Sequence, residues 1–182
     1  RLMYALIVIL VATMAAWLMA LILHLQPVDF LKISLPVGAW ILLRLITSFC
    51  GVFGFSIMFN SLVRLAATAA GIGAIANTLR LEMVDMTAIP PAGAAFVGAL
   101  TAGILASLIK SKVGYPRISL TVPSIVIMVP GMYLYRGFYN LGIMSLGPAA
   151  SWFASAILII AALPLGLIFA RILTDRTFRY CT

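Results

Sequence analysis

The sequence has few of the residues on which most enzymes depend. Its 182 residues include one histidine, four acidic residues and two cysteines. His24 cannot by itself form a histidine-based catalytic triad or a metal cluster, and the isolated Cys50 and Cys181 suit neither a metal site nor a disulfide framework. The glycines Gly71 and Gly73 are followed by alanine, not by the lysine of a nucleotide-binding loop. We therefore predict no metal, no cofactor and no enzymatic activity.

Charged residues are also scarce. They make up 9% of the chain, against 64% hydrophobic residues, and the mean hydropathy is +1.20. A soluble domain is typically about 25% charged, so most of this surface must face lipid. The net charge of +8 would suit nucleic acid in a soluble protein. Here the basic residues stand at the ends of apolar runs, as they do in membrane proteins, so membrane lipid is the predicted partner and nucleic acid is not.

Six apolar runs are long enough, or nearly long enough, to cross a bilayer as helices. Between the third and fourth runs, Arg80, Glu82 and Asp85 are predicted to lie in a polar loop. Arg44, in the second run, is expected to reach the lipid headgroups. The predicted fold is an all-α, polytopic transmembrane helical bundle of about six spans, the fifth of them broken by proline. The runs cover residues 2–25, 37–59, 65–81, 92–109, 118–141 and 149–172.

The basic residues are divided unequally between the two ends of these runs. With the predicted number of spans, most of them share the face that holds both termini. Cytoplasmic segments of membrane proteins are enriched in lysine and arginine. We therefore expect a multi-pass protein of the inner membrane with both termini in the cytoplasm. The basic residues on that face are Arg1, Arg64, Lys110, Lys112, Arg117, Arg171, Arg176 and Arg179.

Small residues recur at every fourth position in two of the runs. Ala94, Gly98, Ala102 and Ala106 share one face of the fourth predicted helix, and the third helix carries a similar series of alanines. In lipid, small side chains let the backbones of two helices approach closely. This face indicates packing inside the bundle; a docking face for a partner subunit is the alternative.

The fifth run contains both Pro123 and Pro130. Each proline removes a main-chain donor and pushes against the preceding turn, and Gly131 adds backbone freedom. Broken helices occur in membranes only where protein or a water-filled cavity covers the freed polar groups, and transporters use such breaks to build substrate sites. We therefore predict a helix break at Pro123, Pro130 and Gly131, with a solute bound beside it.

Arg136 follows this predicted break by six residues. A guanidinium is costly in hydrocarbon and can hold a carboxylate with two hydrogen bonds, so Arg136 is a candidate for binding an anionic or zwitterionic solute. The alternative is that it reaches the outer headgroups within a belt of aromatic residues. The candidate substrate-binding residues are Arg136, Pro130, Gly131, Tyr133, Asn60, Thr121 and Ser124. For the last three, hydrogen bonds within the bundle are the alternative role.

Several segments of residues 45–173 resemble the C-terminal membrane half of the threonine/serine exporter family. They are Gly54-Phe-Ser-Ile-Met-Phe-Asn60-Ser-Leu-Val-Arg64, Tyr115-Pro116 and Val122-Pro123…Val129-Pro130-Gly131…Tyr135-Arg136. This half also occurs as a separate protein, similar to the membrane-only subunit of a two-component exporter implicated in succinate efflux. The resemblance implies secondary export without an ATP site. It also implies functional roles for Asn60 and Arg64 in the turn and for Pro130, Gly131 and Arg136 in the break.

The resemblance further implies how the chain is organised. Residues 34–182 would form the exporter-type membrane domain of about five helices with a short cytoplasmic tail, and residues 1–33 an extra N-terminal transmembrane helix and loop. The family's other half carries a cytoplasmic domain, so we expect a homologous half as partner, a homo-oligomer, or both. The chain would then be a subunit that exports threonine and serine, or a dicarboxylate such as succinate. The alternative is a membrane scaffold that assembles or stabilises a partner protein without transporting a solute.

Overall fold

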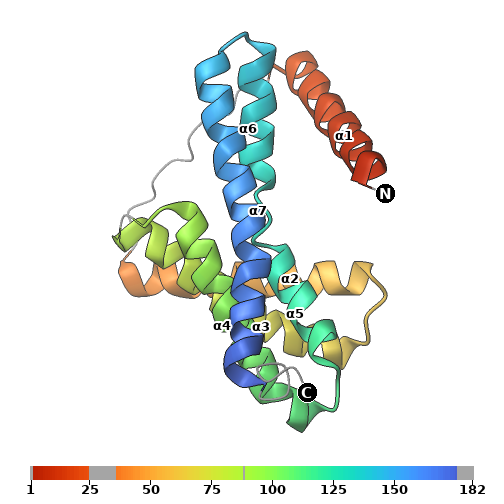
Figure 1. The fold of residues 1–182 in the computed structure, drawn as a ribbon, viewed down its shortest axis with the longest axis vertical. Coiled ribbons are helices and arrows are strands. Elements are labelled where there is room, and N and C mark those ends of the chain that lie inside the picture. The colour runs from red at the N-terminus through yellow and green to blue at the C-terminus, as the bar shows by residue number, and fades with distance from the viewer. Residues whose placement is uncertain (1, 25–35, 88, 176–182) are drawn as a thin grey trace. The chain divides into compact units, whose positions relative to one another are not determined.

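A computed structural model describes residues 2–24, 36–87 and 89–175, and these residues form seven helices and no strand (Figure 1). Cys181 and three of the basic residues used to predict the orientation, Arg1, Arg176 and Arg179, lie outside the described residues. The helices are α1 (Leu2–Ile22), α2 (Val37–Met58), α3 (Val63–Thr87), α4 (Pro91–Val113), α5 (Arg117–Val126), α6 (Gly131–Gly142) and α7 (Leu146–Thr174).

Prolines mark where four of the helices begin. Pro36, Pro90, Pro116 and Pro130 stand at the N-cap positions of α2, α4, α5 and α6. A proline has no N–H to donate, which costs nothing at the start of a helix because the first N–H groups have no helical partner. At the other end of α4, Gly114 adopts a left-handed conformation with φ of 74°. Glycine reaches this conformation without steric cost and so ends the helix.

Four of the described helical segments are long and apolar enough to cross a membrane. The all-α membrane bundle predicted from the sequence is therefore confirmed, and its fifth predicted span is interrupted between α5 and α6. α3 is not among the four segments, and the apolar stretch Leu10–Ile22 of α1 is shorter than they are. The described residues thus give four candidate spans where about six were predicted. These segments are Val37–Met58, Pro91–Lys110, Arg117–Gly142 and Leu146–Thr174.

α3 is longer than predicted. Its apolar run was expected to end at Leu81 and to be followed by a polar loop. Instead Arg80, Glu82 and Asp85 lie in the last turns of the helix, which continues to Thr87. The prediction of a loop was wrong because it rested on charge. Leucine, arginine, glutamate and methionine, which make up much of this segment, are all good helix formers.

The charges at the end of α3 are paired with Arg44 of α2. Nη1 of Arg44 lies 2.7 Å from Oε1 of Glu82, and its Nη2 contacts Oδ2 of Asp85. The guanidinium also lies 5.1 Å from the centre of the Trp40 ring, a cation–π contact. Arg44 is therefore paired with carboxylates of the protein, whereas the expectation that its stem reaches the headgroups stays a prediction.

The chain packs as two compact units. One contains Ser34–Val129 and Ile159–Thr182, and so holds α2 to α5 with the C-terminal part of α7. The other contains Arg1–Ile33 and Pro130–Leu158, and so holds α1 and α6 with the N-terminal part of α7. We call them the α3 unit and the α6 unit, after the helix at the centre of each.

In the α3 unit, α3 packs against α2, α4 and α5. Its core is built from small side chains, and the predicted face of α4 is buried within it. A Cβ atom at Gly98 would lie 3.2 Å from Cβ of Arg80 and 3.2 Å from Sδ of Met128. Close approach of backbones, not interdigitation of large side chains, therefore holds these helices together. The buried alanines are Ala66, Ala69, Ala70, Ala74 and Ala76 of α3 and Ala94, Ala95, Ala99, Ala102 and Ala106 of α4.

The C-terminal part of α7 approaches α4 equally closely. A Cβ atom at Gly166 would lie 2.5 Å from the main-chain oxygen of Phe96, and one at Gly103 would lie 2.5 Å from Cβ of Ala170. Beside this contact the rings of Phe96 and Phe169 meet edge to face, with centroids 5.6 Å apart. Glycine is therefore required at Gly166 and Gly103, because a larger side chain would separate the two helices.

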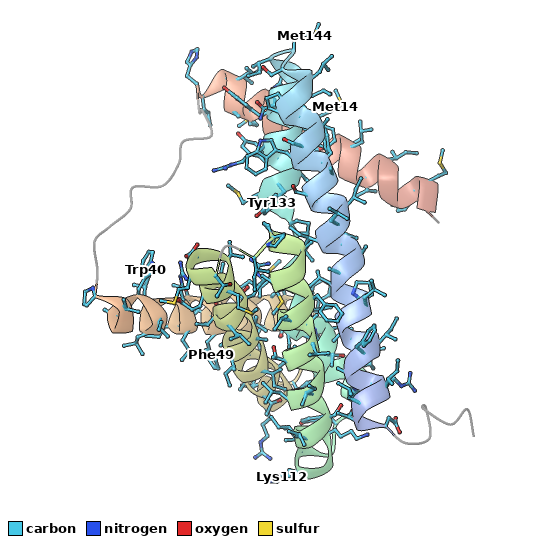
Figure 2. All side chains as sticks on the ribbon, turned by 60° about the vertical axis from the view of Figure 1, so that its left-hand side comes forward. Met14, Trp40, Phe49, Lys112, Tyr133 and Met144 are labelled. Atoms are coloured by element: carbon cyan, nitrogen blue, oxygen red, sulfur yellow. The ribbon has the colours of Figure 1, made fainter. Side chains whose placement is uncertain are left out.

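In the α6 unit, α1 packs against α6. The indole of Trp17 lies against Gly142, where a Cβ atom would overlap the ring. On α7, Phe153 covers Gly137 and meets Phe138 edge to face at 5.0 Å. Contacts of aromatic side chains with glycine thus hold this unit together. Figure 2 shows Tyr133 of the same unit near the start of α6.

Candidate functional site

The fifth predicted helix is interrupted where the ribbon in Figure 1 unwinds between α5 and α6. After α5 the chain tightens into short turns: the N–H of Met128 donates to the Ile125 carbonyl at 2.9 Å, and the N–H of Val129 donates to the Val126 carbonyl at 3.1 Å. Pro130 then has no N–H to offer, so carbonyl groups in this stretch need partners from elsewhere. The break predicted in this helix therefore lies at Pro130.

Pro123 and Gly131 contribute less to the break than predicted. α5 continues through Pro123, which removes only the hydrogen bond that the Ser119 carbonyl would otherwise accept. Gly131 is the first residue of α6, and a Cβ atom there would meet nothing within 4 Å. Of the three predicted residues, Pro130 is the one that the geometry of the break requires.

Arg80 of α3 supplies a hydrogen-bond donor to the broken end of α5. Its Nη1 donates a hydrogen bond of 3.0 Å to the main-chain oxygen of Met128. A charged donor makes a stronger hydrogen bond than a neutral one, and a cation is favoured at the C-terminal end of a helix. Sequence reasoning missed this role because it placed Arg80 in a loop. The sequence did contain a signal for this role. Arg80 follows Gly73 by seven residues, so the two residues lie on one face of a helix.

The rest of α5 lies directly against α3. The buried Ser124 hydroxyl donates to the Ala69 carbonyl at 2.9 Å, and a Cβ atom at Gly73 would lie 3.0 Å from the Ser124 main-chain oxygen. Thr121, also buried, donates to carbonyls of its own helix. The hydroxyls of Thr121 and Ser124 are thus satisfied by main-chain carbonyls, the second of the two roles considered for them.

A polar group that the sequence analysis did not single out lies on α3, one turn before Arg80. Nδ2 of the buried Asn77 donates to Oγ of Ser48 in α2 at 2.9 Å. Oδ1 of Asn77 and Oγ1 of Thr78 are buried and have no partner among the described residues. Leaving a buried polar atom unsatisfied costs roughly 1–3 kcal/mol, so such atoms in a native protein need an explanation. The signal in the sequence was Asn77 itself, a lone amide in an alanine-rich helix.

An open cavity of about 380 Å³ lies in the α3 unit, between α2, the start of α3 and α5. Its wall is mostly apolar, with a serine from each of three segments. Asn60 does not line it. This residue instead ends α2 in a left-handed conformation with φ of 57°, which asparagine tolerates better than most residues. The lining residues are Phe55, Ser56, Phe59, Ser61, Leu65, Ile118, Ser119, Val122, Pro123 and Val126.

In the α6 unit, Trp152 of α7 brings two predicted residues together. The guanidinium of Arg136 lies 4.9 Å from the centre of its ring, and the Tyr133 ring meets it edge to face at 5.5 Å. Both residues follow the start of α6, where Pro130 provides no side-chain cap. The first N–H groups of a helix carry partial positive charge. The arrangement therefore combines the positive end of a helix with a guanidinium and an aromatic surface, which suits a carboxylate.

The predicted site residues therefore fall into two groups. Pro130, Gly131, Tyr133 and Arg136 belong to the α6 unit, whereas Asn60, Thr121 and Ser124 belong to the α3 unit. Within residues 2–24, 36–87 and 89–175, no group of three or more histidine, cysteine, aspartate or glutamate side chains could hold a metal ion. Other polar groups among the described residues include the guanidinium groups of Arg80 and Arg136 and the amide of Asn77.

Comparison with known proteins gives one match. The family profile described as "Threonine/Serine exporter, ThrE" matches residues 44–173. No curated protein and no solved structure matches the chain. The matched range contains α3 to α6 in full with most of α2 and α7, so it includes the broken helix and both arginines beside it.

Proposed function

Because the chain belongs to the threonine/serine exporter family, we propose that it is a membrane subunit of a secondary exporter of small carboxylate-bearing solutes. The solutes are threonine and serine, or a dicarboxylate such as succinate. The subunit lies in the inner membrane with both termini in the cytoplasm. It works with a homologous half that carries a cytoplasmic domain, as a homo-oligomer, or in both ways.

The break between α5 and α6 is the observation that carries this proposal. It interrupts a segment, Arg117–Gly142, that is otherwise long and apolar enough to span a membrane. The exposed main-chain groups at such a break bind polar solutes in many transporters. Arg80 meets one of the freed carbonyls, that of Met128. The break is thus a stable part of the fold.

Arg136 is the proposed carboxylate-binding residue. Its guanidinium rests on Trp152, and the planar fork of an arginine can hold a carboxylate with two hydrogen bonds. Arg136 belongs to α6, and the N-terminal end of this helix is formed by Pro130, Gly131 and Tyr133. A carboxylate held by Arg136 would also be attracted by that helix end.

Asn77 and Thr78 are proposed to contact the solute or its water within the α3 unit. Each has a buried polar atom with no partner among the described residues. A solute with hydroxyl or amino groups, such as serine or threonine, would satisfy these atoms. An ordered water would satisfy them in a purely structural role.

Efflux measurements test the proposed function. Cells that express the chain together with its partner are loaded with labelled threonine, serine or succinate, and the loss of each label is followed. We expect faster loss of at least one solute than from cells that express the Arg136→Ala variant at the same level. Equal rates for every solute would contradict the proposal and favour the scaffold, whose partner would transport without help from this residue.

The partner itself is tested by purification. We expect the chain, extracted in a mild detergent from its native membrane, to co-purify either with a second membrane protein that carries a cytoplasmic domain or with further copies of itself. Mass measurement of the intact complex distinguishes these two outcomes. A monomer that still catalyses export after reconstitution would show that no partner is needed.

A further inference from the structure

A second open cavity, also of about 380 Å³, lies in the α3 unit, where α4 ends, α5 begins and α7 ends. It is formed by residues other than those around the broken end of α5, and the proposed function does not use it. Both basic and apolar side chains line it. The lining residues are Lys110, Arg117, Ile118, Thr121, Leu167, Ile168, Arg171 and Asp175.

The cavity is electropositive. Three basic side chains and one acidic side chain, Asp175, line it. The guanidinium of Arg117 is fixed by uncharged acceptors, the Leu167 carbonyl at 3.5 Å and the Thr174 hydroxyl at 3.4 Å. Gly103 makes room for it, because a Cβ atom there would lie 3.3 Å from Nη2. These two long hydrogen bonds orient Arg117 without neutralising its charge, and Asp175 is the acidic side chain that interacts with it.

The basic residues of this cavity stand where the membrane spans end. Lys110 is the last residue of one candidate span, Arg117 is the first of the next, and Arg171 lies three residues before the end of another. Residues at the ends of spans lie at the depth of the lipid headgroups. The cavity is therefore placed where the charged part of a lipid would meet it.

Apolar side chains extend the wall of the cavity away from the charges. Ile118 is 68% exposed and Ile168 is 46% exposed. Both belong to candidate membrane spans, so their exposed apolar side chains are expected to meet hydrocarbon. A ligand with a negatively charged head and apolar tails would contact both parts of this wall. A small free anion would use the charged part alone.

We propose that this cavity binds the phosphate group of an anionic phospholipid, with Lys110, Arg117 and Arg171 as its ligands. The acyl chains lie along Ile118 and Ile168. Basic pockets between transmembrane helices bind lipid headgroups of this kind through charge attraction and hydrogen bonds to phosphate oxygens. A bound lipid would join the ends of three helices, and so stabilise the α3 unit at this end.

Thermal unfolding of the full chain in a neutral detergent tests the proposal. We expect phosphatidylglycerol to raise the unfolding temperature, and phosphatidylcholine with the same acyl chains to leave it unchanged. Equal shifts with both lipids would overturn the proposal. Inorganic phosphate and succinate are added in separate measurements. If either alone reproduced the shift at the same concentration, the cavity would be a site for a free anion, and the assignment to a lipid would be wrong.

Matched variants locate the binding site. Lys110→Gln and Arg171→Gln are each expected to weaken phosphatidylglycerol binding by about fivefold, since one basic residue contributes roughly 1 kcal/mol near an anionic membrane surface. Lys112→Gln is the control, because Lys112 is exposed at the end of the same helix and does not line the cavity (Figure 2). Retention of lipid in native mass spectrometry gives the affinities. A loss as large in Lys112→Gln as in Lys110→Gln would mean that surface charge alone attracts the lipid.

Discussion

Nη1 of Arg80, in α3, lies 3.0 Å from the main-chain oxygen of Met128, directly after α5 ends. The two residues are 48 positions apart in the chain. The hydrogen bond supplies a partner for a carbonyl that a continuous helix would have satisfied locally. A helix break of this kind is therefore maintained by the neighbouring helix as well as by the proline within it.

Replacement of Arg80 should destabilise the protein. Arg80→Met keeps most of the apolar stem but removes the donor, and we expect the free energy of unfolding to fall by roughly 1.5–3 kcal/mol, the usual contribution of a hydrogen bond to a charged group. Denaturant titration in detergent measures the change. Arg64→Met is the control, because Arg64 is exposed at the start of the same helix. Equal effects of the two variants would show that the hydrogen bond to Met128 contributes nothing to the free energy of unfolding.

The two prolines of the broken helix should respond differently to replacement. Pro130→Ala restores an N–H donor at the break and lets α5 and α6 join, so we expect export to fall by roughly tenfold or more. Pro123→Ala restores a donor inside α5, which is already helical, and should leave export nearly unchanged. Initial rates of efflux at matched expression give the comparison. If both variants export normally, the break has no part in transport and the scaffold hypothesis gains support.

Arg136→Ala should abolish export while the protein still inserts into the membrane. The loss follows from removing a charge-assisted hydrogen bond to the solute carboxylate, worth roughly 1.5–3 kcal/mol or at least a tenfold change in binding. Arg136→Lys keeps the charge but not the planar fork and should export at an intermediate rate. Efflux of labelled solute, with immunoblots for expression, gives the result. Unchanged export by Arg136→Ala would remove this residue from the site.

Added volume at Gly166 should destabilise the α3 unit. In Gly166→Ala, the new Cβ would lie 2.5 Å from the Phe96 main-chain oxygen, and we expect a loss of roughly 1–3 kcal/mol in the free energy of unfolding. Gly71→Ala is the matched control, because a Cβ atom there meets nothing within 4 Å. It should be neutral, or stabilise α3 by up to about 1 kcal/mol. Similar losses in both variants would contradict the close contact of α4 and α7.

The orientation of the chain in the membrane can be tested by labelling cysteines at two exposed positions. Lys112 and Met144 are separated by one candidate span, Arg117–Gly142, and Met144 is 85% exposed (Figure 2). In a chain whose Cys50 and Cys181 are replaced by serine, we expect Met144→Cys to react with an impermeant thiol reagent in intact cells. Lys112→Cys should react only after the cells are permeabilised. The opposite pattern would reverse the predicted topology.

The sequence predicted the features of this fold that depend on local chemistry. Pro130 interrupts its helix because proline lacks an N–H, and this is true in any surroundings. The four-residue spacing of Ala94, Gly98, Ala102 and Ala106 predicted a face that the structure buries. Such features can be read from neighbouring residues because both their cause and their effect lie within a few turns of one helix.

The features that the sequence did not predict depend on distant partners. Arg80 appeared to belong to a loop because charges are rare in spans, yet its partner Met128 lies on another helix. The pairing of Arg44 with the carboxylate of Glu82, 38 positions away, was also not predicted. Nothing within one segment specifies such a pair. The unsatisfied atoms of Asn77 and Thr78 likewise become evident only when the neighbouring helices are in place.

The ion pairs of Arg44 also bear on how the chain enters the bilayer. By itself α2 would carry an uncompensated guanidinium, and a charged side chain within a membrane span is costly. Glu82 and Asp85, which neutralise it, are on α3 and are synthesised later. Stable insertion of α2 should therefore depend on the synthesis of α3 and on its pairing with Arg44.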